Sequence, residues 1–199
     1  MKIFKGRIFS FLKKPDNIHD TGSYILLEKG AIVCDDNGVI VEIDDYSKLA
    51  KKYDGIETED FGSKIICPGF IDLHNHFPQT QVIASYGTKL LEWLNKYTFP
   101  NESLFSDDSH CERESKVFLD LLNNNGITTT VSFGSVHVNS VEYLFREAHN
   151  RNMCVIAGNV LMDRNAPNTV LEKADKSYLN SREIICLLYT SPSPRDAHK

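Results

Sequence analysis

Two histidines separated by one residue, His74 and His76, have the spacing best suited to metal binding in this sequence. They end the run PGFIDLHNH, and alternate side chains of a β-strand point to the same face. A strand over residues 70–76 would therefore bring both imidazoles together, with Asp72 on the same side to orient a ligand. Two imidazoles can fill two corners of a tetrahedral zinc site, and zinc lowers the pKa of bound water to about 7. We expect half of a zinc site here; the alternative is two unrelated surface histidines.

The rest of the chain from residue 64 onward alternates between strand-like and helix-like patterns. The expected strands cover residues 70–76, 127–133 and 153–161. The expected helices cover residues 88–99, the segment from a cap at Ser106 to a stop at Asn125-Gly126, the segment from a cap at Asn139 or Ser140 to Ala148, and residues 170–179. This alternation is typical of an α/β fold with a parallel sheet.

Apolar residues at helical spacing predict which helix faces are buried. These faces consist of Leu90, Leu91, Leu94 and Tyr97 in the helix over 88–99, and of Val117, Phe118, Leu121 and Leu122 in the next helix. We interpret Trp93 as a packing residue, because large aromatic side chains contribute most to cores.

Residues 1–63 have a different pattern. Short strands are expected over residues 2–12, 24–33, 39–43 and 56–61, with a short helix over 46–53. Asn37-Gly38 predicts a tight hairpin, because both residues accept positive φ angles. No cluster of reactive side chains occurs in this part. We therefore interpret it as a small antiparallel sheet with a supporting role.

Composition excludes several classes of protein. A formal net charge of −5 without a basic cluster argues against a dedicated nucleic-acid or membrane binder. The first residues lack the apolar core of a signal peptide, and no run approaches the length of a transmembrane span. Five scattered cysteines form no CxxC motif, so we expect reduced thiols in a cytoplasmic protein.

The run from His76 to Glu102, HFPQTQVIASYGTKLLEWLNKYTFPNE, is far more specific than the histidine pair. Together with the later segments GITTT, SVH and VLMDRNAP, it resembles the guanine deaminase family of the amidohydrolase superfamily. The resemblance covers residues 64–167 well and the N-terminal sheet only loosely. It implies that residues 64–185 form the first three strand–helix units of a (β/α)8 TIM-type barrel, and that residues 1–63 form part of a small β-sandwich.

The resemblance also implies a reaction, the zinc-dependent hydrolysis of guanine to xanthine and ammonia. By position, His74 and His76 match the first two zinc ligands. The base pocket is matched by His76, Phe77, Pro78 and Gln79, with Gln79 hydrogen-bonding the purine. An amide suits that role because it offers both a donor and an acceptor.

The sequence departs from the family at Leu73, where Thr is usual, and at Asn75, where an apolar residue is usual. We expect Asn75 to face the packed outer layer, where it needs a hydrogen-bond partner. Other polar residues near strand ends are His137, Asp163 and Arg164, for which loop capping and ion pairing are favoured over a role in the site. His110 and His149 are expected on helix surfaces.

A complete barrel of this type needs about 250 residues. The family's remaining ligands (a His and an Asp), its Glu proton shuttle and a second catalytic His lie on later strands, so no general acid or base is assigned here. We therefore expect an N-terminal fragment that is inactive alone, of an enzyme family that is commonly dimeric. Residues 186–199, beginning CLLYTSPSPRD, resemble a translated sequencing adapter and are interpreted as an artefact.

Two alternatives stay open. The chain could belong to another amidohydrolase that acts on a different cyclic amide or amine. It could also be a non-catalytic homologue that serves as a binding or assembly module, which a complete chain without the later ligands would support.

Overall fold

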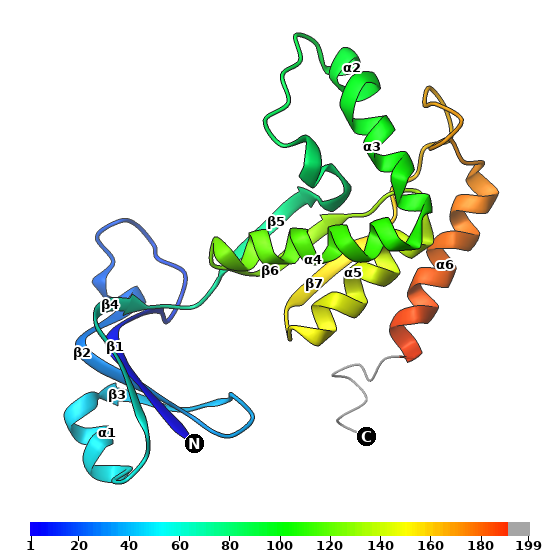
Figure 1. Ribbon diagram of the computed structural model, residues 1–199. Helices are drawn as coiled ribbons and strands as arrows, with labels where there is room; N and C mark the ends of the chain where they lie inside the picture. Colours follow the sequence, from blue (N-terminus) through cyan, green and yellow to red (C-terminus); the bar gives the residue numbers. More distant parts are fainter. Residues whose placement is uncertain (191–199) are drawn as a thin grey trace. The chain divides into compact units, whose positions relative to one another are not determined.

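The computed structural model describes residues 1–190 of the chain (Figure 1). The chain divides into two compact units, one of residues 1–68 and one that begins at Gly69. Each unit has its own sheet and its own hydrophobic core. Among the described residues, none of the helices combines the length and the apolar character that crossing a bilayer requires.

The first unit is a four-stranded sheet with the strand order β3-β2-β1-β4. The strands are β1 (Lys2–Phe11), β2 (Tyr24–Cys34), β3 (Ile40–Asp45) and β4 (Thr58–Ile66), and helix α1 (Tyr46–Lys52) follows β3. β1 pairs antiparallel with β2, and β2 with β3, but β1 and β4 are parallel. The expected antiparallel sheet is therefore wrong for its last strand, because α1 carries the chain back across the sheet.

The β2–β3 hairpin forms at the predicted place by a slightly different mechanism. Only Gly38 takes a positive φ, of 80°. The carboxylate of Asp35 closes the turn by accepting hydrogen bonds from the backbone N–H groups of Asn37 and Val39, each at 2.9 Å. The Asp35 side chain thus stabilises the turn, and a second residue with a positive φ is not needed.

The boundary between the units lies after Pro68, and not at Lys64 as expected. Strand β4 continues through Ile66, because Ile65 and Ile66 pair with Arg7 and Ile8 of β1. This apolar pair therefore belongs to the sheet of the first unit. Its pairing partner is far away in sequence, so the local pattern could not reveal it.

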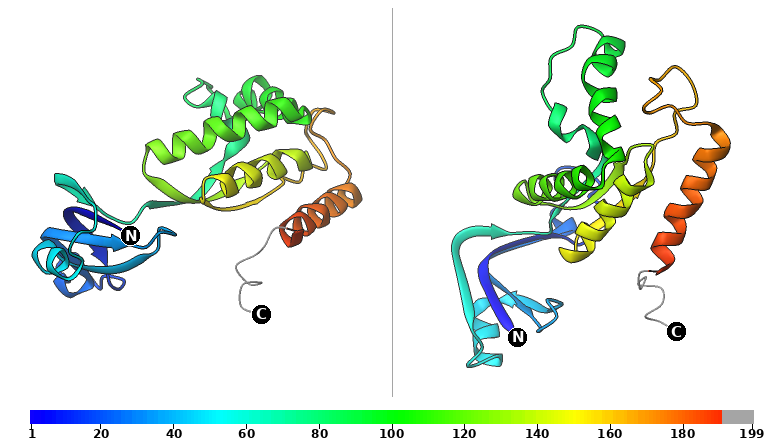
Figure 2. Two further views of the ribbon diagram at one scale, coloured as in Figure 1. Left: turned by 60° about the horizontal axis from the view of Figure 1, so that its bottom comes forward. Right: turned by 45° about the vertical axis from the view of Figure 1, so that its right-hand side comes forward.

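The second unit contains a parallel sheet of three strands in the order β5-β6-β7. The strands are β5 (Phe70–His76), β6 (Ile127–Phe133) and β7 (Cys154–Gly158). Helices α4 (Asp108–Asn124) and α5 (Val138–Asn150) lie side by side on one face of this sheet, and α6 (Ala174–Thr190) lies beside α5 (Figures 1 and 2). The expected α/β fold with a parallel sheet is confirmed.

The core of this unit lies between the sheet and its helices. Its most buried side chains are Phe77, Phe105, Cys111, Leu119 and Leu144. The rings of Phe77 and Phe105 meet edge to face, with centroids 5.0 Å apart. From the predicted face of α4, Phe118 and Leu122 are buried, whereas Val117 and Leu121 are 46% and 41% exposed.

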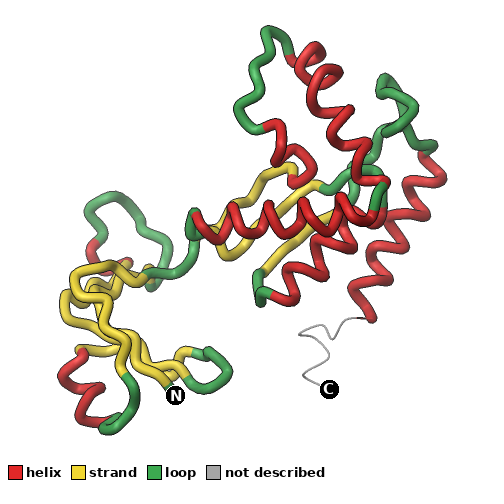
Figure 3. The backbone as a smooth tube through the Cα atoms, in the orientation of Figure 1, coloured by secondary structure: helices red, strands yellow, loops and turns green. Residues whose placement is uncertain are grey.

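The helix expected over residues 88–99 is a composite helix. It consists of α2 (Leu90–Trp93), a π-helical turn (Leu94–Thr98) and α3 (Phe99–Ser103), visible as one rod in Figure 3. Pro100 explains the wide turn, because proline lacks an N–H and its ring would collide with the carbonyl of Lys96 in a regular helix.

The buried face of this composite helix is polar, contrary to expectation. Leu90 and Leu91 are 70% and 72% exposed, whereas Thr98, Asn101 and Glu102 are buried. The π-turn rotates the residues after it relative to a regular helix, so the 3.6-residue period does not carry through. Of the predicted apolar face, Leu94 and Tyr97 are half-buried, so the prediction was wrong for Leu90 and Leu91.

Several predicted element ends shift in the structure. Asp107, and not Ser106, caps α4, and its carboxylate accepts a hydrogen bond from the N–H of His110 at 2.8 Å. His137 occupies the N-cap position of α5, α6 begins at Ala174, and β7 ends at Gly158. Of the segment interpreted as an adapter, residues 186–190 continue the backbone of α6, and residues 191–199 lie outside the described residues.

Candidate active site

Three aromatic rings meet where β5 and β6 end. His76 pairs with Phe133 in the parallel register, and their rings stack with centroids 4.8 Å apart. The ring of His74 meets both of these rings edge on, at 5.4 Å from His76 and 5.5 Å from Phe133. The two imidazoles are thus neighbours at the carboxyl end of the sheet, as the spacing predicted.

Asp72 does not join this group, because β5 contains a bulge. The register runs from the pair Asp72↔Thr130 to the pair Asn75↔Ser132, so three residue steps on β5 face two on β6. The extra residue reverses the alternation of side chains. The carboxylate of Asp72 accepts hydrogen bonds from the backbone N–H of His74 at 3.1 Å and from Nδ2 of Asn75 at 3.1 Å. The expectation that Asp72 shares a face with both histidines is wrong.

Asn75 finds the partners that it was expected to need. Its Nδ2 group donates to Asp72 and to the hydroxyl of Thr130, which is buried beneath the helices. Its Oδ1 atom is buried without a partner among the described residues. The Asn75 side chain therefore fixes the bulge on the helix side of the sheet and leaves the other face to the histidines.

The histidine pair has the chemistry of two zinc ligands. Burial and the neighbouring His74 lower the pKa of His76 below the usual 6.5, so its imidazole is neutral and able to bind a metal near pH 7. Two imidazoles that share a tetrahedral zinc ion have ring centres about 5 Å apart, given Zn–N distances of about 2.1 Å. The observed separation of 5.4 Å fits this value. Within residues 1–190, no group of three or more His, Cys, Asp or Glu side chains could hold a metal.

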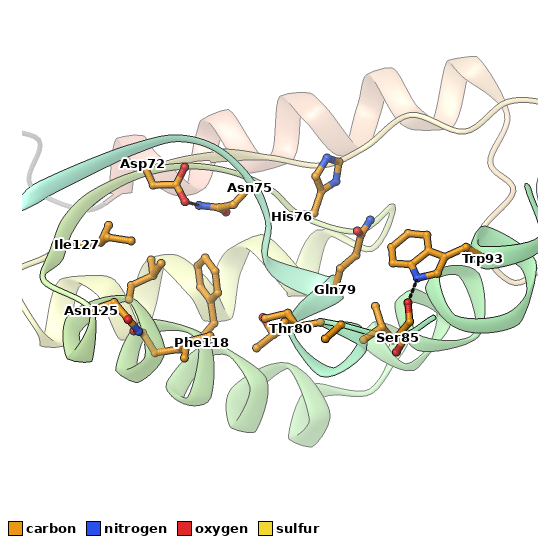
Figure 4. Close-up of a pocket in the computed structure, with 15 residues that line it drawn as sticks. Asp72, Asn75, His76, Gln79, Thr80, Ser85, Trp93, Phe118, Asn125 and Ile127 are labelled. Carbon is orange, nitrogen blue, oxygen red and sulfur yellow. Dashed lines mark hydrogen bonds between the residues drawn. The ribbon is translucent and has the colours of Figure 1, made fainter. Parts of the chain in front are cut away.

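A cleft of about 510 Å³ begins at His76 and runs between β5 and α4 (Figure 4). His76, Gln79 and Trp93 lie at one end, and Asp72, Asn75 and Ile127 lie toward the other. Trp93 is half-buried, and its indole N–H donates to the carbonyl of Ser85 at 3.0 Å. The side chain that we interpreted as packing is therefore held in the wall of the cleft.

Gln79 is held at the polar end of this cleft by Glu102. Its Nε2 group donates to Oε1 of Glu102 at 3.1 Å. Phe77 and Pro78, the other residues matched to the base pocket, have buried side chains that do not line the cleft. The backbone N–H of Phe77 donates to the hydroxyl of Ser132 at 3.2 Å, and the carbonyl of Pro78 accepts from Asn101. These two residues anchor the turn that carries Gln79.

Glu102 is the residue that the sequence interpretation missed. It is 2% exposed, its Oε2 atom has no partner within the described part of the chain, and burial raises the pKa of its carboxyl group. A buried acid beside a cleft is a frequent feature of functional sites. The signal in the sequence was weak, since Glu102 lies just after Pro100 on a helix whose buried face was predicted to be apolar.

The remaining candidates have structural positions outside the cleft. Asp163 and Arg164 form an exposed ion pair at 3.1 Å, and His137 occupies the N-cap position of α5 without a side-chain capping hydrogen bond. The preferred interpretation as an ion pair agrees with the geometry of Asp163 and Arg164, whereas the imidazole of His137 makes no capping hydrogen bond. His149 is exposed as expected, but His110 is only 6% exposed, and its ring meets the ring of Phe105 edge to face at 4.7 Å.

Comparisons with known proteins agree with this geometry. A guanine deaminase of Escherichia coli (strain K12) is 47% identical over 132 residues, which cover 66% of this chain and 30% of that protein. The solved structure of E. coli guanine deaminase matches with a TM-score of 0.88 and 36% identity, over 96% of this chain and 44% of that one. Guanine deaminase from C. acetobutylicum, solved with guanine bound in the active site, matches with a TM-score of 0.81 and 31% identity, over 96% of this chain and 43% of that one.

The chain thus spans between 30% and 44% of the length of these three proteins. A model of the amidohydrolase family matches residues 65–188, from the end of β4 through most of α6. This range is more than half of the chain and includes the histidine pair and the cleft. The chain therefore belongs to the amidohydrolase family.

Proposed function

We propose that this chain provides the first part of the active site of a zinc-dependent guanine deaminase, which hydrolyses guanine to xanthine and ammonia. In this proposal the second unit is the first part of a (β/α)8 barrel and the first unit is part of a β-sandwich. The supporting comparisons are the guanine deaminases matched at 31% to 47% identity. The substrate would be guanine with water, and the protein would act in the cytoplasm, as a homodimer if it follows its family.

The observation that carries the proposal is the contact between His74 and His76 at the carboxyl end of β5, together with a cleft that His76 lines at the same end as Gln79 and Trp93. Barrel enzymes place their sites at the carboxyl ends of the strands, where this pair lies. A planar heteroaromatic ligand needs an aromatic wall and a few polar groups that read its edge. Trp93 and Gln79 supply both of these features.

Zinc is the metal that we assign to His74 and His76. Amidohydrolases are typically metal-dependent, and neutral imidazoles are common zinc ligands. When bound, the ion would activate a water molecule for attack on the carbon that carries the amino group. The chain's own residues have three tasks in this reaction: His74 and His76 hold the metal, Gln79 binds and orients the base, and Trp93 limits its movement in the cleft.

Phe77 and Pro78 contribute to the base pocket without lining the cleft. Their buried side chains fix the turn between β5 and α2, so that His76 and Gln79 have defined positions. Catalysis loses much of its rate when a group moves by about 1 Å. We propose that these two residues shape the pocket without touching the base.

The test is a guanine assay on the protein expressed from the complete reading frame that contains residues 1–185. We expect guanine to be converted to xanthine with release of one ammonia, and we expect H74A and H76A each to lower kcat/KM at least 100-fold. No turnover of guanine would contradict the proposal. Turnover of another cyclic amine or amide in place of guanine would assign the chain to a different amidohydrolase.

A further inference from the structure

The amide of Gln79 can present either of two edges to the cleft, since its oxygen and nitrogen exchange places when the group turns over. Glu102 distinguishes between them. Its side chain is 2% exposed, and its Oε1 atom accepts the hydrogen bond from Nε2 of Gln79 at 3.1 Å. The structure gives Oε1 of Gln79 no partner among residues 1–190, and Gln79 lines the cleft beside His76 (Figure 4).

A carboxylate can only accept hydrogen bonds. If the Gln79 amide turned over, its oxygen would face an oxygen of Glu102, and both would lose a buried hydrogen bond. Hydrogen bonds to charged groups contribute about 1.5–3 kcal/mol, so the wrong orientation is populated by at most about one molecule in ten. Glu102 therefore allows one orientation of the amide.

The neighbouring residue fixes the same turn. Asn101 is 8% exposed, and its Nδ2 group donates to the carbonyl of Pro78. The hydroxyl of Thr80 donates to the carbonyl of Phe77 at 2.7 Å. The π-turn before Pro100 is what brings Asn101 and Glu102 onto the buried face of the helix, so the composite helix holds both the backbone and the side chain of the turn.

We propose that Glu102 is a positioning residue that sets specificity, because it holds the Gln79 amide with Oε1 free to accept from an N–H group of the ligand. The inference rests on the proposed function, because that function names guanine as the ligand. The exocyclic amino group and the ring N–H of guanine are donors of the required kind. A ligand that offers only acceptors on this edge would leave Oε1 unpaired.

The chain contains a matched control. Its sequence has two glutamines, Gln79 and Gln81, and each donates through Nε2 to a buried glutamate. Glu114, the partner of Gln81, is 2% exposed like Glu102. Gln81 does not line the cleft. The variants E102Q and E114Q therefore remove the same charge from equally buried sites, only one of which faces the ligand.

The kinetic test uses the protein expressed from the complete reading frame. A glutamine at position 102 can donate or accept, so Gln79 loses its fixed orientation. We expect E102Q to raise KM for guanine about 10-fold and to change kcat less than about 3-fold. E114Q should change neither parameter by more than about 2-fold. In a Q79A background, E102Q should have no further effect on KM, because Glu102 acts through Gln79.

Two results would overturn the inference: equal KM values for E102Q and E114Q, or a further rise in KM when E102Q is added to Q79A. A structural measurement on the wild-type 199-residue chain is independent of turnover. With glutamine side chains labelled by ¹⁵N, one amide proton of Gln79, assigned with Q79A, should exchange at least about 10-fold more slowly than in free glutamine. Fast exchange would overturn the inference. Absence of guanine turnover would overturn the proposed function alone, and the exchange rate would then decide whether Glu102 fixes Gln79.

Discussion

Two buried carboxylates, Glu102 and Glu114, each accept a hydrogen bond from a glutamine, and the burial of Glu102 has a consequence for stability. Burial raises the pKa of Glu102 above its usual 4.5, although the hydrogen bond from Gln79 opposes this effect. A group that is harder to ionise in the folded state destabilises the fold wherever it must carry its charge. Glu102 therefore positions Gln79 at a cost in stability near neutral pH.

Replacing Glu102 with Gln should make stability less dependent on pH. The folded protein keeps a proton on Glu102 in a range where the unfolded chain has lost it, so the contribution of Glu102 is full below pH 4.5 and is lost as the pH rises through the folded-state pKa. The Tm of E102Q relative to wild type should therefore rise between about pH 5 and about pH 8. Calorimetric scans at both pH values measure this difference.

The control is E112Q on the exposed side of α4. The hydrogen bond from Lys116 lowers the pKa of Glu112, so its contribution is present above pH 4.5 and is lost as the pH falls. The Tm of E112Q relative to wild type should therefore stay nearly constant between about pH 5 and about pH 8, and should rise only as the pH falls below 4.5. Parallel changes in both variants would contradict the role of burial at Glu102.

Cysteine reactivity should follow burial. Burial raises the pKa of the Cys111 thiol to about 12, and its Sγ donates to the carbonyl of Phe105 at 3.2 Å. Cys67, Cys154 and Cys186 are exposed. Because the thiolate is the reactive form, iodoacetamide should modify these three residues and leave Cys111 unmodified in the native protein.

Peptide mass spectrometry after a timed reaction measures the extent of modification at each cysteine. The same reaction in concentrated urea is the control, and there all five thiols should react at similar rates. Native-state modification of Cys111 as fast as that of Cys67 would show that the core around Phe105 is open.

At the scale of elements, the local pattern predicted strands and missed what depends on distant partners. The bounds of β5 and β6 were predicted to the residue, because β-branched and apolar runs between turn residues are unambiguous. The bulge in β5 was not predictable, since it arises from pairing with β6, a strand far away in the sequence. The bulge lies where the register passes from Asp72↔Thr130 to Asn75↔Ser132. As a result, the histidine pair was found and the position of Asp72 was not.

The composite helix illustrates a second limit of prediction. Its apolar spacing suggested a regular helix with Leu90 and Leu91 inside, but Pro100 imposes a π-turn and brings Glu102 inward. Proline is visible in a sequence, whereas the way in which a helix accommodates it depends on the surrounding packing. The residue that holds Gln79 was therefore present in the motif and could not be recognised from it.

The N-terminus of α4 gives a prediction that separates two neighbouring residues. Asp107 accepts hydrogen bonds from the N–H of His110 at 2.8 Å and from the hydroxyl of Ser109 at 2.5 Å, whereas the hydroxyl of Ser106 donates to the carbonyl of Ser103. We expect D107A to lower the Tm by several degrees, as the loss of an N-cap usually does, and S106A to leave it nearly unchanged. Thermal unfolding followed by circular dichroism measures both variants.

The pH dependence of this effect has a defined sign. Hydrogen bonds from Ser109 and His110 lower the pKa of Asp107 below 3.8. The stabilisation is therefore present above pH 3.8 and is lost as the pH falls through the folded-state pKa. A decrease in Tm in S106A as large as that in D107A would show that Ser106 is the N-cap of α4.

At the scale of the second unit, α4 and α5 lie on one face of the sheet, and no helix of residues 69–190 covers the other face (Figure 2). Ile71, Leu73 and Ile156 are 63%, 72% and 59% exposed. Parallel sheets are normally buried on both faces. The second unit therefore has both an open sheet face and an incomplete set of metal donors. Zinc affinity measures how incomplete the donor set is.

We expect the 199-residue chain to bind zinc far more weakly than complete structural sites, whose apparent binding free energies are about 10 kcal/mol or more. The reason is that His74 and His76 supply two donors, whereas no third group joins them within residues 1–190. Competition with a chromophoric chelator at pH 7 measures the affinity. H74A and H76A should each abolish the residual binding, whereas H149A, on an exposed helix end, should leave it unchanged.

One further variant, H198A, removes a histidine that lies outside the described residues and so isolates the contribution of the pair. The protein expressed from the complete reading frame should bind one zinc ion tightly, and H76A should weaken that binding by at least about 100-fold, because a site that loses one of its ligands keeps little affinity. Tight zinc binding by the 199-residue chain that survives both H74A and H198A would place the metal elsewhere in the chain. The carboxyl end of β5 would then not be the metal site.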